Sequence, residues 1–124
     1  MKLDKDLVRE ILLALETDDS DPRAPKLLNI SGYSYPQIAY TVRILAEGGL
    51  IEALNASSFD GFDWKPQRLT YNGHEYLETI RDAEVWRKTK EIANKAGVFS
   101  LQVLIEIGKT VVKQELMKYG VHLP

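Results

Sequence analysis

The chain has 124 residues, of which 44% are apolar and 27% are charged, a composition typical of a globular protein. It contains no cysteine, which excludes disulfide bonds, thiolate metal sites and cysteine nucleophiles. Its formal net charge of −2 excludes a strong overall attraction to nucleic acid or anionic lipid. No apolar run approaches the ~20 residues that a membrane span requires, and the first ten residues mix both charge signs, so we expect a cytoplasmic protein with no membrane partner.

Residues 3 to 16 predict the first helix. Asp4 is a good N-cap, and Leu3 before it can pack against Val8 inside the helix. The apolar residues recur at helical spacing and form a stripe wide enough to place this helix at the centre of the core. They are Leu7, Val8, Ile11, Leu12, Ala14 and Leu15.

A polar stretch follows the first helix. Asp18, Asp19 and Asp21 are either a weak cation site or a solvated turn, and the turn is favoured because their spacing matches no calcium loop and Pro22 follows directly. The short apolar run from Lys26 to Ile30 then predicts an edge strand that closes a small sheet.

The stretch from Tyr33 to Ala53 predicts a capped helix that leads directly into a strand. Ser34 and Gln37 have the spacing of a capping box, in which each side chain bonds the other residue's backbone. Gly48 and Gly49 offer a left-handed C-terminal cap. The core side of the helix is formed by Ile38, Val42, Leu45 and Ala46.

Residues 50 to 54 and 65 to 69 predict two paired strands. Asp60-Gly61 between them is a strong hairpin signal, because both central positions of such a turn require positive φ. Pro66 cannot donate to the ladder, so the tip is expected to be loose rather than a regular ribbon. A long hairpin after a helix has the form of a wing.

A two-residue turn at Asp60-Gly61 places Phe59 opposite Phe62 and Ser57 opposite Trp64. Three aromatic side chains then share one face of the hairpin tip. They suit an anchor for a protein partner. The alternative is that they fold back onto the C-terminal helices as a satellite of the core.

Two further helices are expected after the wing. Thr70 can cap a helix from Tyr71 to about Arg81, in which Gly73 permits close approach of a neighbour. Asp82 can cap a continuation that Gly97 ends at Ala96. Its inward residues are expected to be Val85, Trp86, Thr89, Ile92 and Ala93.

A last helix is predicted from Leu101 to about Tyr119, capped by Ser100 and followed by Gly120. Its apolar face is wider than one neighbouring helix can cover. Either this helix lies between other elements or it contributes a homodimer contact through residues 100–119.

The order helix, strand, helix, hairpin, helix is that of a winged helix-turn-helix protein. The segment from Val42 to Ile51, VRILAEGGLI, resembles the end of a recognition helix and its entry into the wing. The segment from Leu69 to Gly73, LTYNG, resembles the Leu-Thr-x-x-Gly that follows the wing in the same superfamily. The resemblance implies an α+β, mostly helical fold with a winged-helix core at 1–81, its wing at about 50–70, and a C-terminal helical extension at 82–124, all in one domain.

Four pieces of the chain carry a closer resemblance: LDKDLVREILLALE, GYSYPQIAYTVRILAEGGLIEA, PQRLTYNGHEYLETIRD, and VWRKTKEIA with an apolar helix after it. In these pieces the chain is similar to the YjcQ-like family of small bacterial proteins, which are often carried by prophages. This resemblance implies a winged-helix fold and implies no activity.

DNA binding is the first functional hypothesis, by analogy with the fold. Among the outward residues of the second helix, Gln37 could read adenine, Arg43 could contact guanine or phosphate, and Tyr40 could contact phosphate. Lys65 and Arg68 supply the cations of the wing, but Glu52, Asp60 and Asp63 leave residues 50–70 with a net charge of −1. On this hypothesis, which the fold supports and the charge opposes, the protein is a transcriptional regulator, of prophage type as the family resemblance implies, and its partner is DNA.

A protein-binding winged helix is the second hypothesis. Ile44 occupies an outward position where DNA readers often place a basic residue, and Glu47 cancels the charge of Arg43. The wing tip carries Phe59, Phe62 and Trp64 instead of the cations that phosphate would require. On this hypothesis Tyr40, Ile44 and the aromatic wing tip bind a protein partner.

The remaining charged residues give weaker signals. Arg81, Arg87, Lys88, Lys90 and Lys95 alternate with acids and indicate a solvated helix face, with a phosphate-contacting patch as the alternative. The two histidines, at 74 and 122, cannot form a metal triad or a Ser-His-Asp set, so we expect no enzymatic activity, no catalytic or metal site and no cofactor.

Overall fold

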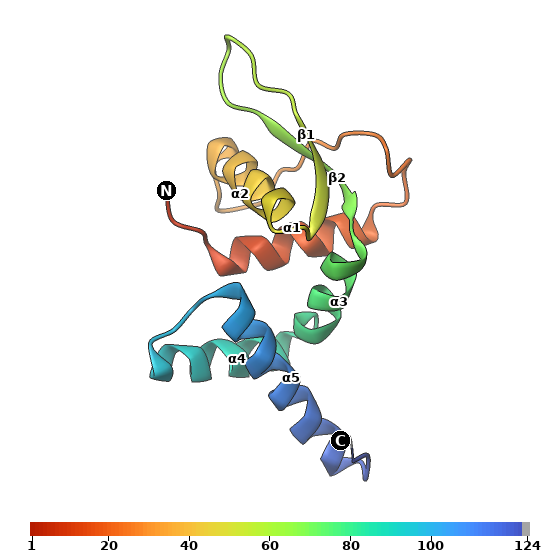
Figure 1. Cartoon of the computed structure of the whole chain (residues 1–124), viewed down its shortest axis with the longest axis vertical. Helices are drawn as coiled ribbons and strands as arrows, with labels where there is room; N and C mark the ends of the chain where they lie inside the picture. Colours follow the sequence, from red (N-terminus) through yellow and green to blue (C-terminus); the bar gives the residue numbers. More distant parts are fainter. Residues whose placement is uncertain (123–124) are drawn as a thin grey trace. The chain divides into compact units, whose positions relative to one another are not determined.

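The computed structural model describes residues 1–122 and divides the chain into two compact units, Met1–Leu77 and Glu78–Pro124. The described part contains five helices and one two-stranded hairpin, so the fold is α+β, mostly helical and winged-helix-like with a small wing, as expected (Figure 1). The boundary between the units falls inside the helix Tyr71–Ile80, four residues before the end of the predicted winged-helix core at 81. The second unit holds the helical extension.

Helix α1 (Lys5–Thr17) forms the base of the first unit. The Asp4 side chain caps it by accepting a bond from the Leu7 amide at 2.9 Å. Its apolar stripe is buried and contacts both the next helix and the second strand of the hairpin, which confirms its central place in the core. The buried residues are Leu7, Val8, Ile11, Leu12 and Leu15.

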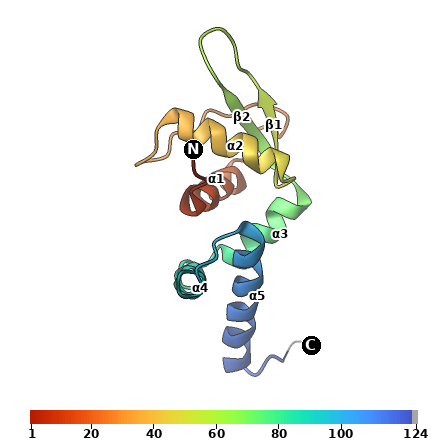
Figure 2. The same ribbon diagram turned by 60° about the vertical axis from the view of Figure 1, so that its left-hand side comes forward.

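Helix α2 (Tyr35–Glu47) has the expected capping box, because Ser34 and Gln37 each bond the other residue's backbone amide. The helix ends in a right-handed Gly48 (φ −78°), and only Gly49 takes the left-handed conformation (φ +75°). The Leu50 amide closes the end by bonding the Leu45 carbonyl at 3.0 Å. This cap turns the chain straight into the hairpin, which contacts α2 through both strands (Figure 2).

Strands β1 (Ile51–Asn55) and β2 (Trp64–Leu69) pair in antiparallel register. A bulge after Glu52 shifts the register by one residue, from Glu52 opposite Arg68 to Ala53 opposite Pro66. Pro66 therefore lies next to an irregularity, where its missing amide costs little.

The predicted turn at the wing tip is wrong by one position. The reciprocal backbone bonds join Ser58 and Gly61 at 3.0 Å, so Phe59 and Asp60 are the two central residues. Gly61 closes the turn and is the one residue of the turn with positive φ (+134°). Phe59 consequently lies at the tip itself rather than opposite Phe62.

The predicted edge strand at 26–30 is also wrong, because the described sheet has two strands. The segment is attached to β2 by one backbone bond, from the Lys26 amide to the Pro66 carbonyl at 2.8 Å. The Lys26 ammonium group is buried and donates to the carbonyls of Asp21 (2.8 Å) and Gln67 (2.6 Å). A lysine side chain therefore replaces the ladder of a third strand.

Helix α3 (Tyr71–Ile80) begins directly after the wing, as predicted. It ends at Ile80, one residue before the predicted end at Arg81. The Thr70 hydroxyl caps it by accepting a bond from the Gly73 amide at 3.1 Å. A Cβ atom at Gly73 would lie 1.9 Å from the Leu50 carbonyl oxygen, so the close approach expected there is confirmed.

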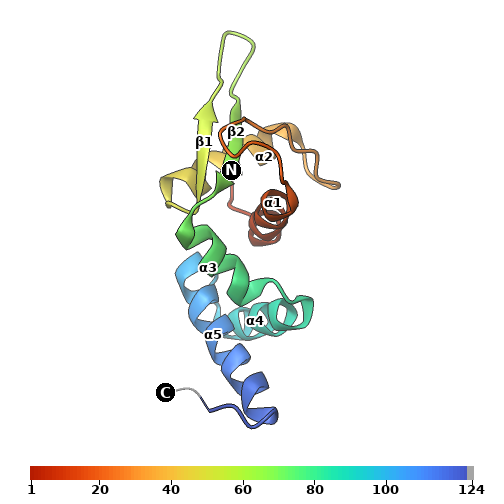
Figure 3. The same ribbon diagram turned by 90° about the vertical axis from the view of Figure 1, so that its right-hand side faces the viewer.

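Helices α4 (Ala83–Ala96) and α5 (Leu101–Lys118) pack against each other in the second unit (Figure 3). Asp82 and Ser100 cap them, and Gly97 ends α4 in the left-handed conformation, all as predicted. Trp86 is buried, but the prediction that Ile92 points inward is wrong, because 45% of its surface is exposed. The cause is that α5 covers the neighbouring flank of α4, where Thr89 and Ala93 are completely buried.

Candidate recognition surface on helix α2 and the wing

The outward side of α2 and the adjoining wing form one candidate surface, which we call the recognition face. The α2 members are predicted from sequence to point outward, the wing members are aromatic and basic residues of the hairpin, and the structure leaves each of them partly or fully exposed. Helical periodicity was sufficient to identify the α2 members, because none of them is needed in the core. The recognition face comprises Gln37, Tyr40, Arg43, Ile44, Glu47, Phe59, Phe62, Trp64, Lys65 and Arg68.

Arg43 joins the helix to the wing. Its guanidinium carbon lies 5.9 Å from the ring centroid of Phe62 and 5.7 Å from that of Trp64. Its Nε also donates to the Glu47 carboxylate at 3.0 Å, one helical turn away. Cation–π contacts of this kind are worth about 0.5–1 kcal/mol at exposed sites. Arg43, which the sequence suggested as a base reader, therefore supports the position of two wing aromatics.

A second contact between α2 and the wing centres on Asp63. The Tyr35 hydroxyl donates to Asp63 Oδ1 at 2.5 Å, and the Lys65 ammonium forms an ion pair with the same carboxylate. The Asp63 amide in turn donates to Ser57 Oγ at 2.8 Å across the hairpin. Sequence reasoning missed Tyr35 and counted Asp63 only as a charge, because no local pattern links two residues 28 positions apart.

The electrostatics of this contact follow from its partners. The bond from Lys65, and then the bond from Tyr35, hold the pKa of Asp63 below its usual value of 3.8. Burial, followed by the bond to Asp63, raises the pKa of Tyr35 above 10.0. The arrangement keeps the carboxylate ionised and the phenol protonated at neutral pH.

The cations of the recognition face are all matched by carboxylates. Arg43 bonds Glu47, Lys65 bonds Asp63, and Arg68 Nη2 lies 2.7 Å from Glu52 Oε1. The first unit as a whole carries eight lysines and arginines against twelve aspartates and glutamates, a net charge of −4. A DNA duplex would therefore meet a unit of negative net charge, and the cations of the recognition face would already be paired with carboxylates.

Gln37 is also committed within the fold. Its Oε1 accepts the bond from the Ser34 amide at 2.9 Å that completes the capping box. Bidentate reading of adenine uses both the oxygen and the nitrogen of the amide, so it would take this cap away from the helix. Gln37 positions the start of α2 rather than offering a free amide.

Phe59 is the most exposed apolar member of the recognition face. Its side chain is fully exposed, and 43% of Phe62 is exposed, so neither belongs to a satellite of the core. The reciprocal bonds between Ser58 and Gly61 fix the turn that carries Phe59. The wing thus presents a bare aromatic ring beside Asp60.

The basic residues of α4 are paired in the way that a solvated helix face requires. Arg87 bonds Glu84 (2.5 Å) and Glu91 (3.1 Å), and Lys95 lies 3.7 Å from Glu91. Lys90 lies over the ring of Trp86 at 5.5 Å. These contacts favour the solvated face over a phosphate-contacting patch.

The acids after α1 form turn contacts, in agreement with the solvated-turn interpretation. Asp18 accepts from the Ser20 amide at 2.8 Å, and Asp21 accepts from the Arg23 amide at 2.9 Å. Across residues 1–122, no group of three or more histidines, cysteines, aspartates or glutamates could hold a metal ion. His74 is exposed, and no helix in this described range is long and apolar enough to cross a membrane.

Comparisons with known proteins match most of the chain. The family model described as hypothetical protein (DUF2513) matches residues 2–99. An uncharacterised protein of Haemophilus influenzae is 35% identical over 118 residues, which cover 94% of this chain and 99% of that protein. No solved structure matches. The matches agree with the expectation of a family without an assigned function, under the DUF2513 description rather than the YjcQ-like one.

Proposed function

This chain belongs to the DUF2513 family, and we propose that its recognition face binds another protein. The observation that carries the proposal is the fully exposed Phe59 ring at the tip of a hydrogen-bonded turn. An exposed aromatic held on a fixed backbone loses little conformational freedom when it enters a pocket, which is the property of an interface anchor.

The charges around Phe59 define the partner. Asp60 lies beside the ring at the tip, and the whole first unit carries a net charge of −4. Complementary potentials speed association and exclude unsuitable partners. The partner is therefore a protein with an apolar pocket surrounded by basic residues.

Substitution of the anchor tests this proposal. Phe59→Ser removes an exposed side chain and leaves the core unchanged, so the protein stays folded while binding of the partner falls at least about tenfold, as expected for an anchor residue. The matched control is Leu27→Ser, which removes another exposed apolar side chain, 66% exposed, outside the recognition face. The measurement is affinity capture from an extract of the source organism, with the bound proteins identified and then titrated individually.

Two results would contradict the proposal. Equal recovery of every bound protein by the original chain and by the Phe59→Ser variant would show that the ring anchors nothing. Loss of the same proteins with Leu27→Ser would show that binding follows general surface hydrophobicity rather than the recognition face.

Duplex DNA is the second candidate ligand, supported by the winged-helix-like arrangement and by the exposure of Arg43 on α2. In this case Arg43 would exchange its bond to Glu47 for a phosphate or a base. A gel shift with generic duplex at ~50 mM salt should then show binding that weakens steeply as salt rises, and Arg43→Ala should reduce it. The absence of a shift at ~50 mM salt, where phosphate-dominated binding is strong, rejects DNA and leaves the protein ligand.

A further inference from the structure

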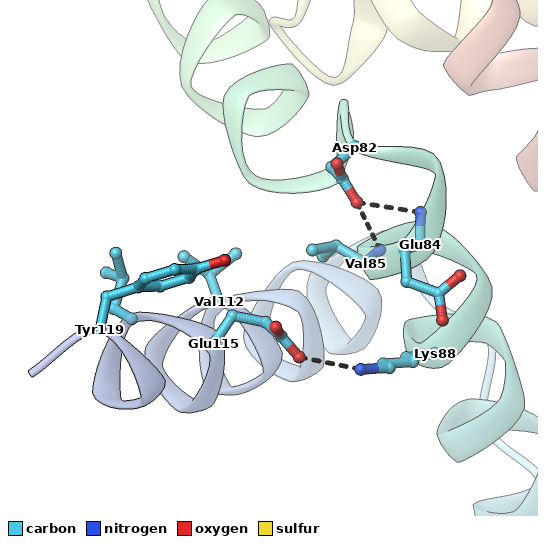
Figure 4. A pocket seen from close by; sticks show the side chains of 8 residues that line it. Asp82, Glu84, Val85, Lys88, Val112, Glu115 and Tyr119 are labelled. Carbon is cyan, nitrogen blue, oxygen red and sulfur yellow. Dashed lines mark hydrogen bonds and ion pairs between the residues drawn. The ribbon is translucent and has the colours of Figure 1, made fainter.

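A cavity of about 310 Å³ opens in the second unit between the first turns of α4 and the last turns of α5 (Figure 4). Its walls are apolar and consist mainly of Val85, Val112, Leu116 and the ring of Tyr119. The size lies at the lower end of the range for small-molecule sites, about 300–1,000 Å³. Tyr119 is 83% exposed and lines the cavity from its solvent side.

Most charges at the edge of the cavity neutralise one another. The Lys88 ammonium lies 2.8 Å from Glu115 Oε1, an ion pair visible across the cavity in Figure 4. Lys118 also contacts Glu115, at 3.1 Å. Glu84 is paired with Arg87 at 2.5 Å. Arg87 also bonds Glu91 at 3.1 Å, so these three cations and three carboxylates offer no net attraction to a ligand of either sign.

Asp82 is the exception among the carboxylates that line the cavity. Its Oδ1 accepts both capping bonds, from the amides of Glu84 (2.9 Å) and Val85 (3.0 Å). Asp82 is exposed, and within residues 1–122 the structure shows no hydrogen bond or ion pair to its Oδ2. One oxygen is sufficient for the cap, so the other is available, beside an apolar wall, for a donor that the chain does not supply.

We propose that this cavity binds a small organic cation that carries one ammonium group on an apolar body. The ammonium donates to Asp82 Oδ2, a charge-assisted bond, and the body lies against Val112, Leu116 and the Tyr119 ring. An anion would be repelled by the unpaired carboxylate of Asp82. A dication could pair only one of its two charges, because Asp82 is the single carboxylate of the cavity that has no ion-pair partner in the described part of the chain. The proposal does not depend on what the recognition face binds.

Benzylammonium is a suitable probe, with benzyl alcohol as a neutral control of similar shape. Titration of the full chain, followed by amide chemical shifts, should give saturable changes confined to residues 82–88 and 112–119. Benzyl alcohol should bind at least about tenfold more weakly, because it cannot form the charge-assisted bond. Equal affinity for the two probes, or the absence of saturable changes in these segments, would overturn the proposal.

Two substitutions in the cavity, Asp82→Asn and Val112→Phe, locate the site, and Asp60→Asn on the wing is the control. Asp82→Asn keeps an equally good N-cap and removes the charge, so the fold persists while benzylammonium affinity falls about tenfold. Asp60→Asn makes the same change on the wing and should leave the affinity unchanged. Val112→Phe fills the cavity and should weaken both probes, with the helix content preserved. Unchanged benzylammonium binding by either Asp82→Asn or Val112→Phe would show that the cavity is not the site.

Discussion

At the scale of single residues, Gly73 lies in the first turn of α3, where its backbone approaches that of Leu50 just before β1. A Cβ atom there would lie 1.9 Å from the Leu50 carbonyl oxygen, a backbone atom that cannot move without displacing β1. The identity of this residue is therefore fixed by the approach of two backbone segments rather than by its own dihedral angles.

Gly73→Ala should lower the free energy of unfolding by about 1–3 kcal/mol or more, the cost of inserting atoms into a filled space. Gly48→Ala is the matched control, because its Cβ would meet ordinary contacts at 3.5 Å and its φ of −78° suits alanine. Urea denaturation measures both variants. Similar stabilities for the two variants would contradict the close approach.

Lys26 shows why residue type alone misled the sequence analysis. An apolar run after a turn is typical of an edge strand, and the run contains a lysine that such a strand would leave in solvent. In the structure its ammonium is buried on two carbonyl oxygens, which satisfies the backbone without a ladder. No local pattern distinguishes these two outcomes.

At the scale of elements, the wing is held to α2 by two contacts near opposite ends of the helix. Tyr35 bonds Asp63 near the start of α2. Arg43, one helical turn before the end of α2, lies over Phe62 and Trp64. Both contacts are polar at one side and aromatic at the other. The wing is thus positioned by side-chain contacts. Acid can break the contact at Asp63, and substitution can break either one.

Acid should release the contact at Asp63. Because its pKa is lowered in the folded chain, the carboxylate stabilises the wing at pH values above 3.8, and this stabilisation is lost as the pH falls through the lowered value. The amide signals of residues 56–63 should therefore broaden or shift below pH 3.8 together, before global unfolding.

Asp63→Asn separates this effect from the titration of other carboxylates. The variant cannot titrate at residue 63, so its wing signals should lose this acid transition, while Asp60→Asn should retain it. Tyr35→Phe removes one of the two bonds and should move the transition to higher pH, because the pKa of Asp63 is then lowered less. An identical transition in the Asp63→Asn variant would show that another group controls the wing.

The helices could be predicted from sequence because their signals are local. The caps at Ser34, Asp82 and Ser100 and the stop at Gly97 each depend on a few neighbouring residues, and each is confirmed. The turn of the hairpin was misplaced because an Asp-Gly pair suits the two central positions of one turn type as well as the last two positions of another, and the structure has the second arrangement. Most of the exposure along α2 was predictable for the same local reason, but Thr41 is buried and Ala46, which was expected on the core side, is partly exposed.

The contacts that organise the recognition face were not predictable. Arg43 meets Phe62 and Trp64 because the hairpin packs against α2, and the one-position error at the turn is enough to misplace both rings. Ile92 was misassigned because helical periodicity defines an apolar stripe but not how much of it a single neighbouring helix covers.

At the scale of the whole molecule, charge is divided unequally between the two units. The first unit has a net charge of −4, and the second has eight lysines and arginines against six aspartates and glutamates, a net charge of +2. The overall charge of −2 therefore conceals two units of opposite sign, which would respond differently to ionic strength when they bind partners.

The homodimer expected through residues 100–119 remains a prediction. Along α5, Leu101, Ile105, Val112 and Leu116 are half-buried, so one flank of the helix is incompletely covered in the single chain. If two copies associate there, Ile105→Glu should convert a dimer to a monomer in sedimentation equilibrium, and Gln102→Glu, at an exposed position of the same helix, should not. A monomer at the highest soluble concentration of the original chain would reject the dimer.

The closed turn from Ser58 to Gly61 has an evolutionary consequence. Its backbone bonds are made within the turn, and Phe59 and Asp60 contribute nothing to the core, so selection for stability does not restrain their identity. Related chains can therefore exchange the residues of the tip while keeping Ser34, Gly73 and the buried face of α1. We expect the tip to diverge among family members faster than the framework that carries it, and the rate of that divergence to follow the partner.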